Sequence, residues 1–265
     1  MTSPLAILGN RTVRFFGYIG GVARQSMSGV YWTFIAPFRG SKLRFRATIH
    51  QMVLVGYEAI PVVCLISFSI GLIMAFQGAY EMRKVGATRY VIDLVAVSMT
   101  RELGPLMTAI IVIGRSGSAF AAEIGTMKVS EELDALTTMG LNAIHFLLSP
   151  KLLAMLIMMP CLATIADMAG VLGGATFAFA SDLHLGLGQY LQATGEALIG
   201  RDIITGLIKS VMFGIVITQI GCYEGFTVSG GPEGVGRSTT DSVVTSIFMV
   251  VLVDMVFTAL FYIIG

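Results

Sequence analysis

Three long, mainly apolar tracts constrain this chain more than any other feature: Leu94–Ile113, Leu152–Ala180 and Val243–Ile264. A helix needs roughly 20 apolar residues to cross the hydrocarbon core of a bilayer, which is about 30 Å thick. A short acidic segment, Ser130–Gly140, lies between the first two tracts and is too polar to enter that core. The pattern predicts a membrane protein in which this segment lies at a membrane face.

The composition agrees with a membrane protein and argues against other classes. Hydrophobic residues make up 55% of the 265 residues and charged residues only 12%, whereas soluble domains carry about 25% charged residues. The three cysteines and three histidines are scattered and lack the spacing of a disulfide framework or a zinc site. The net charge is +1 and no basic cluster carries interleaved aromatic residues, so we expect no nucleic-acid partner.

The apolar tracts predict an all-α integral membrane protein with five transmembrane helices. These crossings are expected at about residues 53–79, 91–122, 151–180, 202–224 and 243–264. Polar connections are predicted at Tyr80–Tyr90, Ser181–Gly200 and Gly225–Asp241, the last of which is rich in glycine. The third crossing is longer than one upright helix requires, which favours a tilted helix over the alternative, a short hairpin.

Residues 1–50 differ in character from the predicted transmembrane domain, residues 51–265. They contain seven Lys or Arg and no Asp or Glu, and aromatic residues lie between the charges. Such stretches are typical of interfacial helices that lie against anionic headgroups. A solvated tail is the alternative interpretation.

The basic N-terminal region also predicts the orientation of the chain. By the positive-inside rule the N-terminus is cytoplasmic, although Arg83, Lys84 and Arg89 then form a weaker opposing signal outside. With five crossings, this orientation places both Ser130–Gly140 and Gly225–Asp241 on the cytoplasmic side.

The acidic segment Ser130–Gly140 predicts a short amphipathic helix. Ser130 suits the N-cap, acidic residues in the first turn complement the helix dipole, and Gly140 suits the C-terminal end. The apolar ridge is expected from Leu133, Leu136 and Met139, and the solvated face from Glu131, Glu132 and Asp134. This shape suits docking into a groove of a soluble partner; a connecting loop that happens to be helical is the alternative.

Charged residues inside the crossings need partners, since Arg, Lys or Asp at a helix centre costs about 2.5–3.5 kcal/mol. With a rise of about 1.5 Å per residue, Lys209 and Asp254 fall in nearly the same layer, which predicts a structural pair. Arg101 and Glu102 are adjacent and point about 100° apart on a helix, so they cannot pair with each other. Two interpretations of Arg101 stay open: a cavity where it meets a lipid phosphate, and a pair with another helix.

Small residues recur four positions apart in the second and third crossings, a spacing that lets helices approach closely in lipid. The stripes are Gly114, Ser118 and Ala122; Gly117, Ala121 and Gly125; and Gly170 and Gly174. They predict close packing within the subunit or, alternatively, a dimer seam.

Several of these segments, in this order, resemble the MlaE (YrbE) permease family over about residues 50–265. They are Arg101–Pro105 (RELGP), Gly114–Ala119 (GRSGSA) with Ala121–Gly125 (AAEIG), Glu132–Leu136 (ELDAL) with Met139 and Gly140, and Gly230–Thr240 (GGPEGVGRSTT). One departure is Pro232, where a small residue such as alanine is expected.

The resemblance implies a homodimeric permease of an ABC-type transporter that moves phospholipids between the inner and outer membranes of a bacterium and supports outer-membrane lipid asymmetry. It places the chain in the inner membrane with three kinds of partner: a cytoplasmic ATPase, a periplasmic MCE-domain protein and a STAS-domain protein. It also implies that the acidic helix is the coupling helix that contacts the ATPase.

Two further sets of site residues are predicted, the second of them from the resemblance. Candidate residues of the lipid pathway are Gln77, Tyr80, Arg101 and Glu102. Candidate residues of a cytoplasmic loop are Gly231, Glu233, Gly234, Gly236 and Arg237.

The chain itself lacks the G-x-x-x-x-G-K-[ST] loop that cradles nucleotide phosphates. We therefore expect no enzymatic activity and no bound cofactor or metal, with ATP and Mg²⁺ held by the partner ATPase. The alternative function is an ion-coupled secondary transporter that uses Glu58, Asp167 or Asp254 as titrating carboxylates. An intramembrane enzyme is a third class, but catalytic clusters such as H-E-x-x-H are absent from the sequence.

Overall fold

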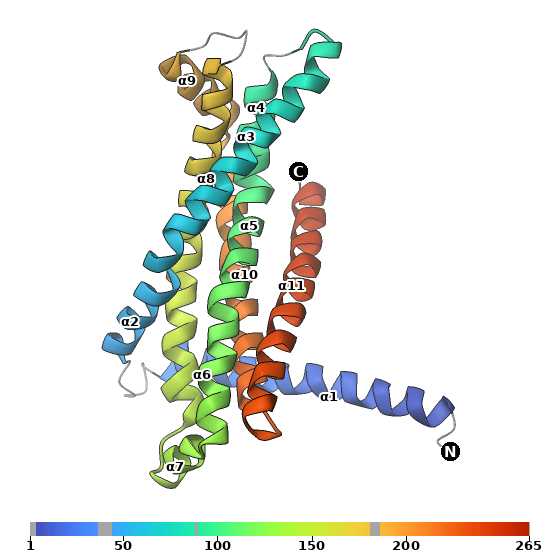
Figure 1. Cartoon of the computed structure of the whole chain (residues 1–265), viewed down its shortest axis with the longest axis vertical. Coiled ribbons are helices and arrows are strands. Elements are labelled where there is room, and N and C mark those ends of the chain that lie inside the picture. The colour runs from blue at the N-terminus through green and yellow to red at the C-terminus, as the bar shows by residue number, and fades with distance from the viewer. Residues whose placement is uncertain (1–3, 37–43, 88–89, 181–185, 265) are drawn as a thin grey trace.

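The computed structural model describes residues 4–36, 44–87, 90–180 and 186–264, and over these residues the chain is helical with no strand (Figure 1). Five helical spans are long and apolar enough to cross a membrane. They are Phe45–Lys84, Val91–Val129, Ile144–Phe179, Gly200–Phe226 and Gly231–Ile263. The predicted all-α fold with five crossings is confirmed.

Most crossings are built from more than one helical element. The first comprises α2 (Phe45–Val55), η3 (Tyr57–Ala59) and α3 (Ile60–Lys84); the second comprises α4 (Val91–Ser98), η5 (Met99–Leu103), α5 (Gly104–Val112), η6 (Ile113–Gly117) and α6 (Ser118–Val129). The remaining crossings are η7 (Ile144–Leu148) with α8 (Ser149–Ala180), then α10 (Gly200–Phe226) and α11 (Gly231–Ile264). Outside the crossings lie α1 (Pro4–Val30), η1 (Tyr31–Ile35), α7 (Glu132–Thr138) and α9 (Leu187–Ala197).

The core forms where α8 packs against α3 and α10, and where α10 packs against α6 and α11. Glycines permit the closest of these contacts. A Cβ on Gly71 would lie 1.9 Å from the Gly170 carbonyl oxygen, and one on Gly221 would lie 2.8 Å from the Gly117 oxygen. Gly117 and Gly170 therefore serve packing within the subunit, whereas Gly114 has open space around it.

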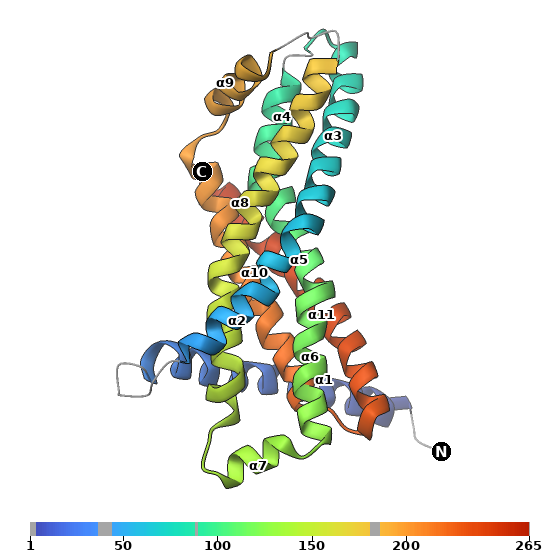
Figure 2. The same ribbon diagram turned by 60° about the vertical axis from the view of Figure 1, so that its left-hand side comes forward.

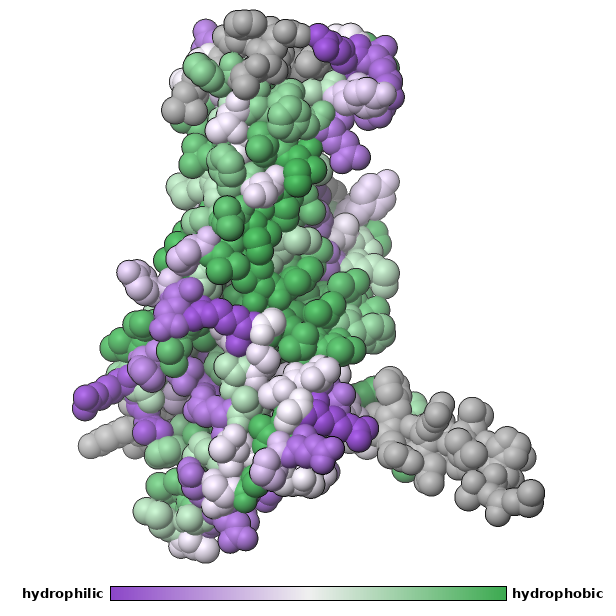
Figure 3. All heavy atoms as spheres, viewed as in Figure 1, coloured by the Kyte–Doolittle hydropathy of each residue, from purple (hydrophilic) through white to green (hydrophobic). Residues whose placement is uncertain are grey.

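The two ends of the bundle differ in what they carry. Figures 1 and 2 show α7 at one end, with α1 crossing the bundle near that end and extending away from it. The helix α9 and the C-terminal end of α3 lie at the opposite end. Figure 3 shows apolar side chains along the middle of the bundle and polar side chains near α7. The basic N-terminal helix and the acidic helix thus share one end.

Several predicted boundaries are wrong, because hydropathy marks the apolar part of a helix and not its hydrogen-bonded ends. The predicted hairpin at 80–90 is helical up to Lys84, and α6 continues past residue 122 to Val129. The predicted loop at 181–200 contains the helix α9, while residues 181–185 lie outside the described part, as does Arg89. Residues 151–180, predicted as the third crossing, all lie in the continuous helix α8 with Pro160 inside it, which excludes the hairpin alternative.

Candidate functional site

The acidic helix α7 is fastened to the bundle by its own apolar side. Leu133 is only 5% exposed and joins the main hydrophobic core, and Leu136 is half-buried against it. The prediction that Leu133 belongs to an apolar ridge free to contact a partner is therefore wrong. Leu133 anchors the helix to the core instead. Met139 is 72% exposed, and Glu131 and Glu132 are exposed as well. The surface that α7 offers to a partner is thus acidic with one large apolar side chain.

The C-terminal end of α7 agrees with the prediction, whereas the N-terminal end does not. Ser130 does not cap α7: its hydroxyl donates to the Thr126 carbonyl at 2.9 Å, at the end of α6. Glu131 takes the N-cap position with φ 60°, a left-handed conformation that turns the chain sharply. Gly140 has φ 74°, and the Leu141 N–H donates to the Leu136 carbonyl at 3.0 Å, as in a Schellman ending.

The helix α1 is joined to α10 by polar contacts near the same end. The Tyr18 hydroxyl donates to Glu224 Oε1 at 2.8 Å, and Gln25 Nε2 donates to the Gln219 carbonyl at 3.1 Å. Burial, reinforced by the Glu224 contact, raises the pKa of the Tyr18 phenol above its ordinary value, so the hydroxyl keeps its proton as a donor. The sequence pattern gave no signal for this contact, since it joins residues 206 positions apart.

The predicted cytoplasmic loop is instead the first part of α11. Gly231, Glu233, Gly234, Gly236 and Arg237 all lie within α11, so the connection from α10 shrinks to residues 227–230. Positive φ angles at Gly230 and Gly231, 92° and 72°, make the turn. Val235 packs beside Gly125 of α6, which gives the helical start of α11 a buried contact. Glycine content alone predicted a loop, but this contact favours a helix.

Lys209 is the centre of an intramembrane charge cluster, which we define as Glu102, Lys209, Asp254 and Thr258. Lys209 is fully buried, and its Nζ lies 2.8 Å from Asp254 Oδ1 and 2.7 Å from Thr258 Oγ1. Its Nζ also contacts Glu102 Oε2. The cluster therefore joins the second, fourth and fifth crossings. The predicted partner Asp254 is present, and Glu102 is a second partner that helical spacing did not indicate.

The four candidate lipid-pathway residues fall into separate places. Arg101 Nε lies 3.7 Å from Asp202 Oδ1, and the Arg101 side chain is 38% exposed. Glu102 belongs to the charge cluster. Gln77 and Tyr80 are exposed on α3, and among the described residues neither forms a hydrogen bond or ion pair with Arg101 or Glu102.

Two further ion pairs were missed by sequence reasoning. Arg115 Nη2 contacts Glu58 Oε2, which links the first and second crossings. Lys151 is 1% exposed, and its Nζ lies 2.6 Å from Glu123 Oε2 and 4.9 Å from the Phe120 ring centroid. Each pair joins different helices, so only the fold brings its members together.

These features define a class of protein before any comparison. Five crossings surround paired charges, one polar helix projects at one end, and the described residues contain no group of three or more His, Cys, Asp or Glu that could hold a metal. Such an arrangement is that of a polytopic membrane protein.

Comparisons with known proteins identify the family. A family model described as permease MlaE matches residues 48–260. A probable ABC transporter permease protein from Rickettsia bellii is 36% identical over 255 residues, which is 96% of each chain. A probable ABC transporter permease protein from Synechocystis sp. is 37% identical over 210 residues, which is 79% of each chain. The chloroplastic protein TRIGALACTOSYLDIACYLGLYCEROL 1 from Arabidopsis thaliana is 36% identical over 223 residues, 83% of this chain and 63% of that protein.

The chain belongs to the MlaE permease family of ABC transporters, so the resemblance read from the sequence is confirmed. It is a multi-pass membrane permease subunit, a type of protein that generally has no enzymatic activity of its own. Membership in this family implies an ATPase partner.

Replacing Lys209 by Met should destabilise the protein more than removing either acidic partner, because Glu102 and Asp254 would then face each other without a cation. Breaking a buried pair costs about 3–5 kcal/mol. Asp254→Asn should be milder, since Glu102 still pairs with Lys209. The measurements are the yield of monodisperse protein in detergent and its unfolding temperature.

The triple variant K209M/E102Q/D254N, which removes all three charges, should recover much of the yield lost in K209M. Lys84→Met is the matched control, since Lys84 is exposed at a helix end and its partners among the described residues, Glu81 and the Tyr80 ring, are exposed as well. A K209M variant as stable as K84M would contradict the assigned role of the cluster.

Proposed function

We propose that this chain is the transmembrane subunit of an ABC-type transporter that moves phospholipids between the inner and outer membranes of a bacterium, supporting outer-membrane lipid asymmetry. The observation that carries the proposal is α7, a short acidic helix fastened by Leu133 with Met139 and Glu132 exposed. In a family of ABC permeases, this helix is the natural contact for the ATPase. No covalent chemistry is required of the chain itself.

The partners follow from this role. A cytoplasmic ATPase holds ATP and Mg²⁺ and contacts α7, while this chain binds no cofactor. A second copy of the chain completes the permease as a homodimer. This is supported by α11, whose most apolar window is only 11% buried within one subunit. A periplasmic MCE-domain protein and a STAS-domain protein complete the proposed complex in the bacterial inner membrane, with the N-terminus cytoplasmic and residues 1–50 at the interface.

Two observations support a lipid substrate: the name of one related protein and the chemistry of the side chains in the bundle. The name of the Arabidopsis relative refers to a galactolipid, trigalactosyldiacylglycerol. We place Gln77, Tyr80, Arg101 and Glu102 in the lipid pathway, with the half-exposed Arg101 guanidinium as the group that meets the lipid phosphate. Arginine suits this task because its planar fork matches phosphate oxygens.

The rival function, ion-coupled secondary transport, loses support. Of the three carboxylates it would use, Glu58 contacts Arg115 and Asp254 contacts Lys209. These two carboxylates are thus occupied by cations of the same chain, which leaves only Asp167 of the three. Kinship with ABC transporter permeases also points to nucleotide energy supplied by a partner.

Membrane sidedness gives a first test. In a variant without Cys64, Cys161 and Cys222, a cysteine at Thr137 of α7 should react with an impermeant maleimide only after spheroplasts are permeabilised. A cysteine at Glu196 of α9, at the opposite end of the bundle, should react in intact spheroplasts. Labelling at position 137 in intact spheroplasts would overturn the proposed orientation.

Coupling gives a second test. Met139→Asp and Glu132→Arg should each weaken binding of the ATPase about tenfold, ~1.4 kcal/mol. The reason is that side chains buried at the centre of an interface contribute at least this much to the binding free energy. The measurement is ATPase recovered per permease after purification from native membranes, together with ATP-dependent transfer of a fluorescent phospholipid between vesicles. Glu196→Arg is the control, an exposed charge reversal at the other end. Normal recovery of ATPase with both α7 variants would exclude α7 as the contact.

Phospholipid binding at Arg101 gives a third test. Arg101→Ala should lower the phospholipid found by mass spectrometry in extracts of the purified complex several-fold, and Arg101→Lys should retain part of it, since charge is kept but the fork is lost. Asp202→Asn separates the two interpretations of Arg101. Equal losses in R101A and D202N would mean that Arg101 acts only by pairing with Asp202.

A further inference from the structure

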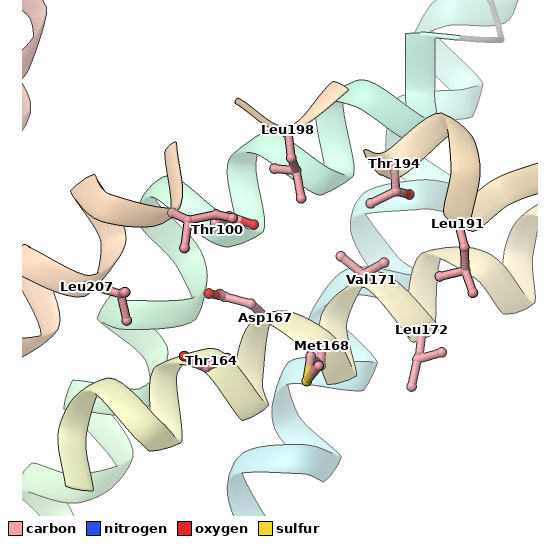
Figure 4. Close-up of a pocket in the computed structure, with 11 residues that line it drawn as sticks. Thr100, Thr164, Asp167, Met168, Val171, Leu172, Leu191, Thr194, Leu198 and Leu207 are labelled. Carbon is pink, nitrogen blue, oxygen red and sulfur yellow. The ribbon is translucent and has the colours of Figure 1, made fainter. Parts of the chain in front are cut away.

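A cavity of about 460 Å³ lies between α8, α9, α10 and the π-helical turn η5 (Figure 4). Its wall is mainly apolar, with Val171 and Leu172 from α8, Leu191 from α9 and Leu207 from α10. Its volume falls within the range of about 300–1,000 Å³ that is usual for small-ligand sites. The cavity is therefore large enough for a ligand and not merely a packing defect.

The cavity is reachable from outside the bundle. Met168 is 65% exposed, and Leu172 and Leu191 are each 46% exposed, although all three line it. It lies toward the end of the bundle that carries α9, beside the first turns of α10. A molecule partitioned into the surrounding bilayer can thus enter sideways without passing through the subunit core.

One side chain gives the cavity a chemical preference. Asp167 lines it, and Figure 4 shows the carboxyl group directed toward Thr100 with Thr164 nearby. Asp167 forms no hydrogen bond and no ion pair with any residue in the part of the chain that the structure describes. Its Oδ1 is buried against Gly104 of α5, while the side chain as a whole borders the cavity. A buried polar group without a partner is costly.

Four other carboxylates of the crossings are paired instead. Glu58, Glu102, Asp202 and Asp254 each lie against a cation of the same chain. Asp167 has an apolar cavity in front of it where the others have an Arg or a Lys. The missing partner is a hydrogen-bond donor, and the space beside it accepts hydrocarbon.

We propose that this cavity binds a single-chain amphiphile: an aliphatic chain whose head carries a hydrogen-bond donor, an ammonium or a hydroxyl group. The head donates to Asp167, and the chain lies along Val171, Leu172 and Leu191. An anionic head that only accepts hydrogen bonds is disfavoured, since it would face the carboxyl group. The site does not depend on the proposed transport function, because it shares no residue with α7 or with the lipid-pathway candidates.

Photolabelling of the purified full-length protein in nanodiscs tests this site. Three probes share a twelve-carbon chain with a terminal diazirine and differ in the head: ammonium, hydroxyl or sulfonate. At equal micromolar concentration, the first two should label peptides from α8, α9 and the start of α10, about tenfold more than the sulfonate, the effect of one charge-assisted hydrogen bond. Peptide mass spectrometry locates and quantifies the label.

Two variants assign the labelling to the cavity. Leu191→Trp fills the space and should abolish labelling by all heads, whereas Gln192→Trp, the exposed neighbour on the same helix, should leave it unchanged. Asp167→Asn should reduce labelling by the ammonium probe more than by the hydroxyl probe. Equal labelling by the three heads of the unmodified protein would overturn the role of Asp167. Absence of label from the lining peptides would overturn the site itself. Both of these outcomes are measured on the unmodified protein, so they hold even where a variant fails to fold.

Discussion

The structure depends on one constraint: a charge taken into the membrane must meet a partner there. Lys209 is fully buried, and it is tolerable only because Glu102, Asp254 and Thr258 surround its ammonium group. Together with Lys209 itself, these residues come from three different crossings, so the ion pairs also fix how those crossings sit relative to one another. Apolar contacts in lipid lack the hydrophobic driving force that they have in water, which gives such polar contacts more influence on the arrangement.

The end of the bundle that carries α7 is also held by contacts between distant segments. Leu133 holds the helix to the core, while α1 is tied to α10 through Tyr18 and Glu224. Because α7 also packs against α6, a force applied to its exposed face is transmitted to the bundle and not absorbed by a loose loop. A partner can shift the equilibrium between two helix packings of the permease only by the difference in its binding free energy for the two. A firmly anchored α7 allows binding of the partner to depend on how the helices are packed.

Helical periodicity and membrane thickness predicted much of the fold, since they depend on local sequence alone. Equal depth placed Lys209 beside Asp254, and Gly140 ends α7 with the expected positive φ. Contacts between distant segments could not be predicted in this way. Glu102 reaches Lys209 only because the second and fourth crossings pack together. The start of α11, which its glycine content predicted to be a loop, is helical, and its half-buried Val235 packs beside Gly125.

Asp167 shows what a carboxylate in a crossing means once its surroundings are known. From the sequence alone, Glu58, Asp167 and Asp254 were equivalent candidates for titration. The fold separates them, because two meet cations of their own chain and the third faces an apolar cavity. A paired carboxylate stabilises the bundle, whereas an unpaired one that borders an accessible space marks a place where another molecule supplies the missing donor.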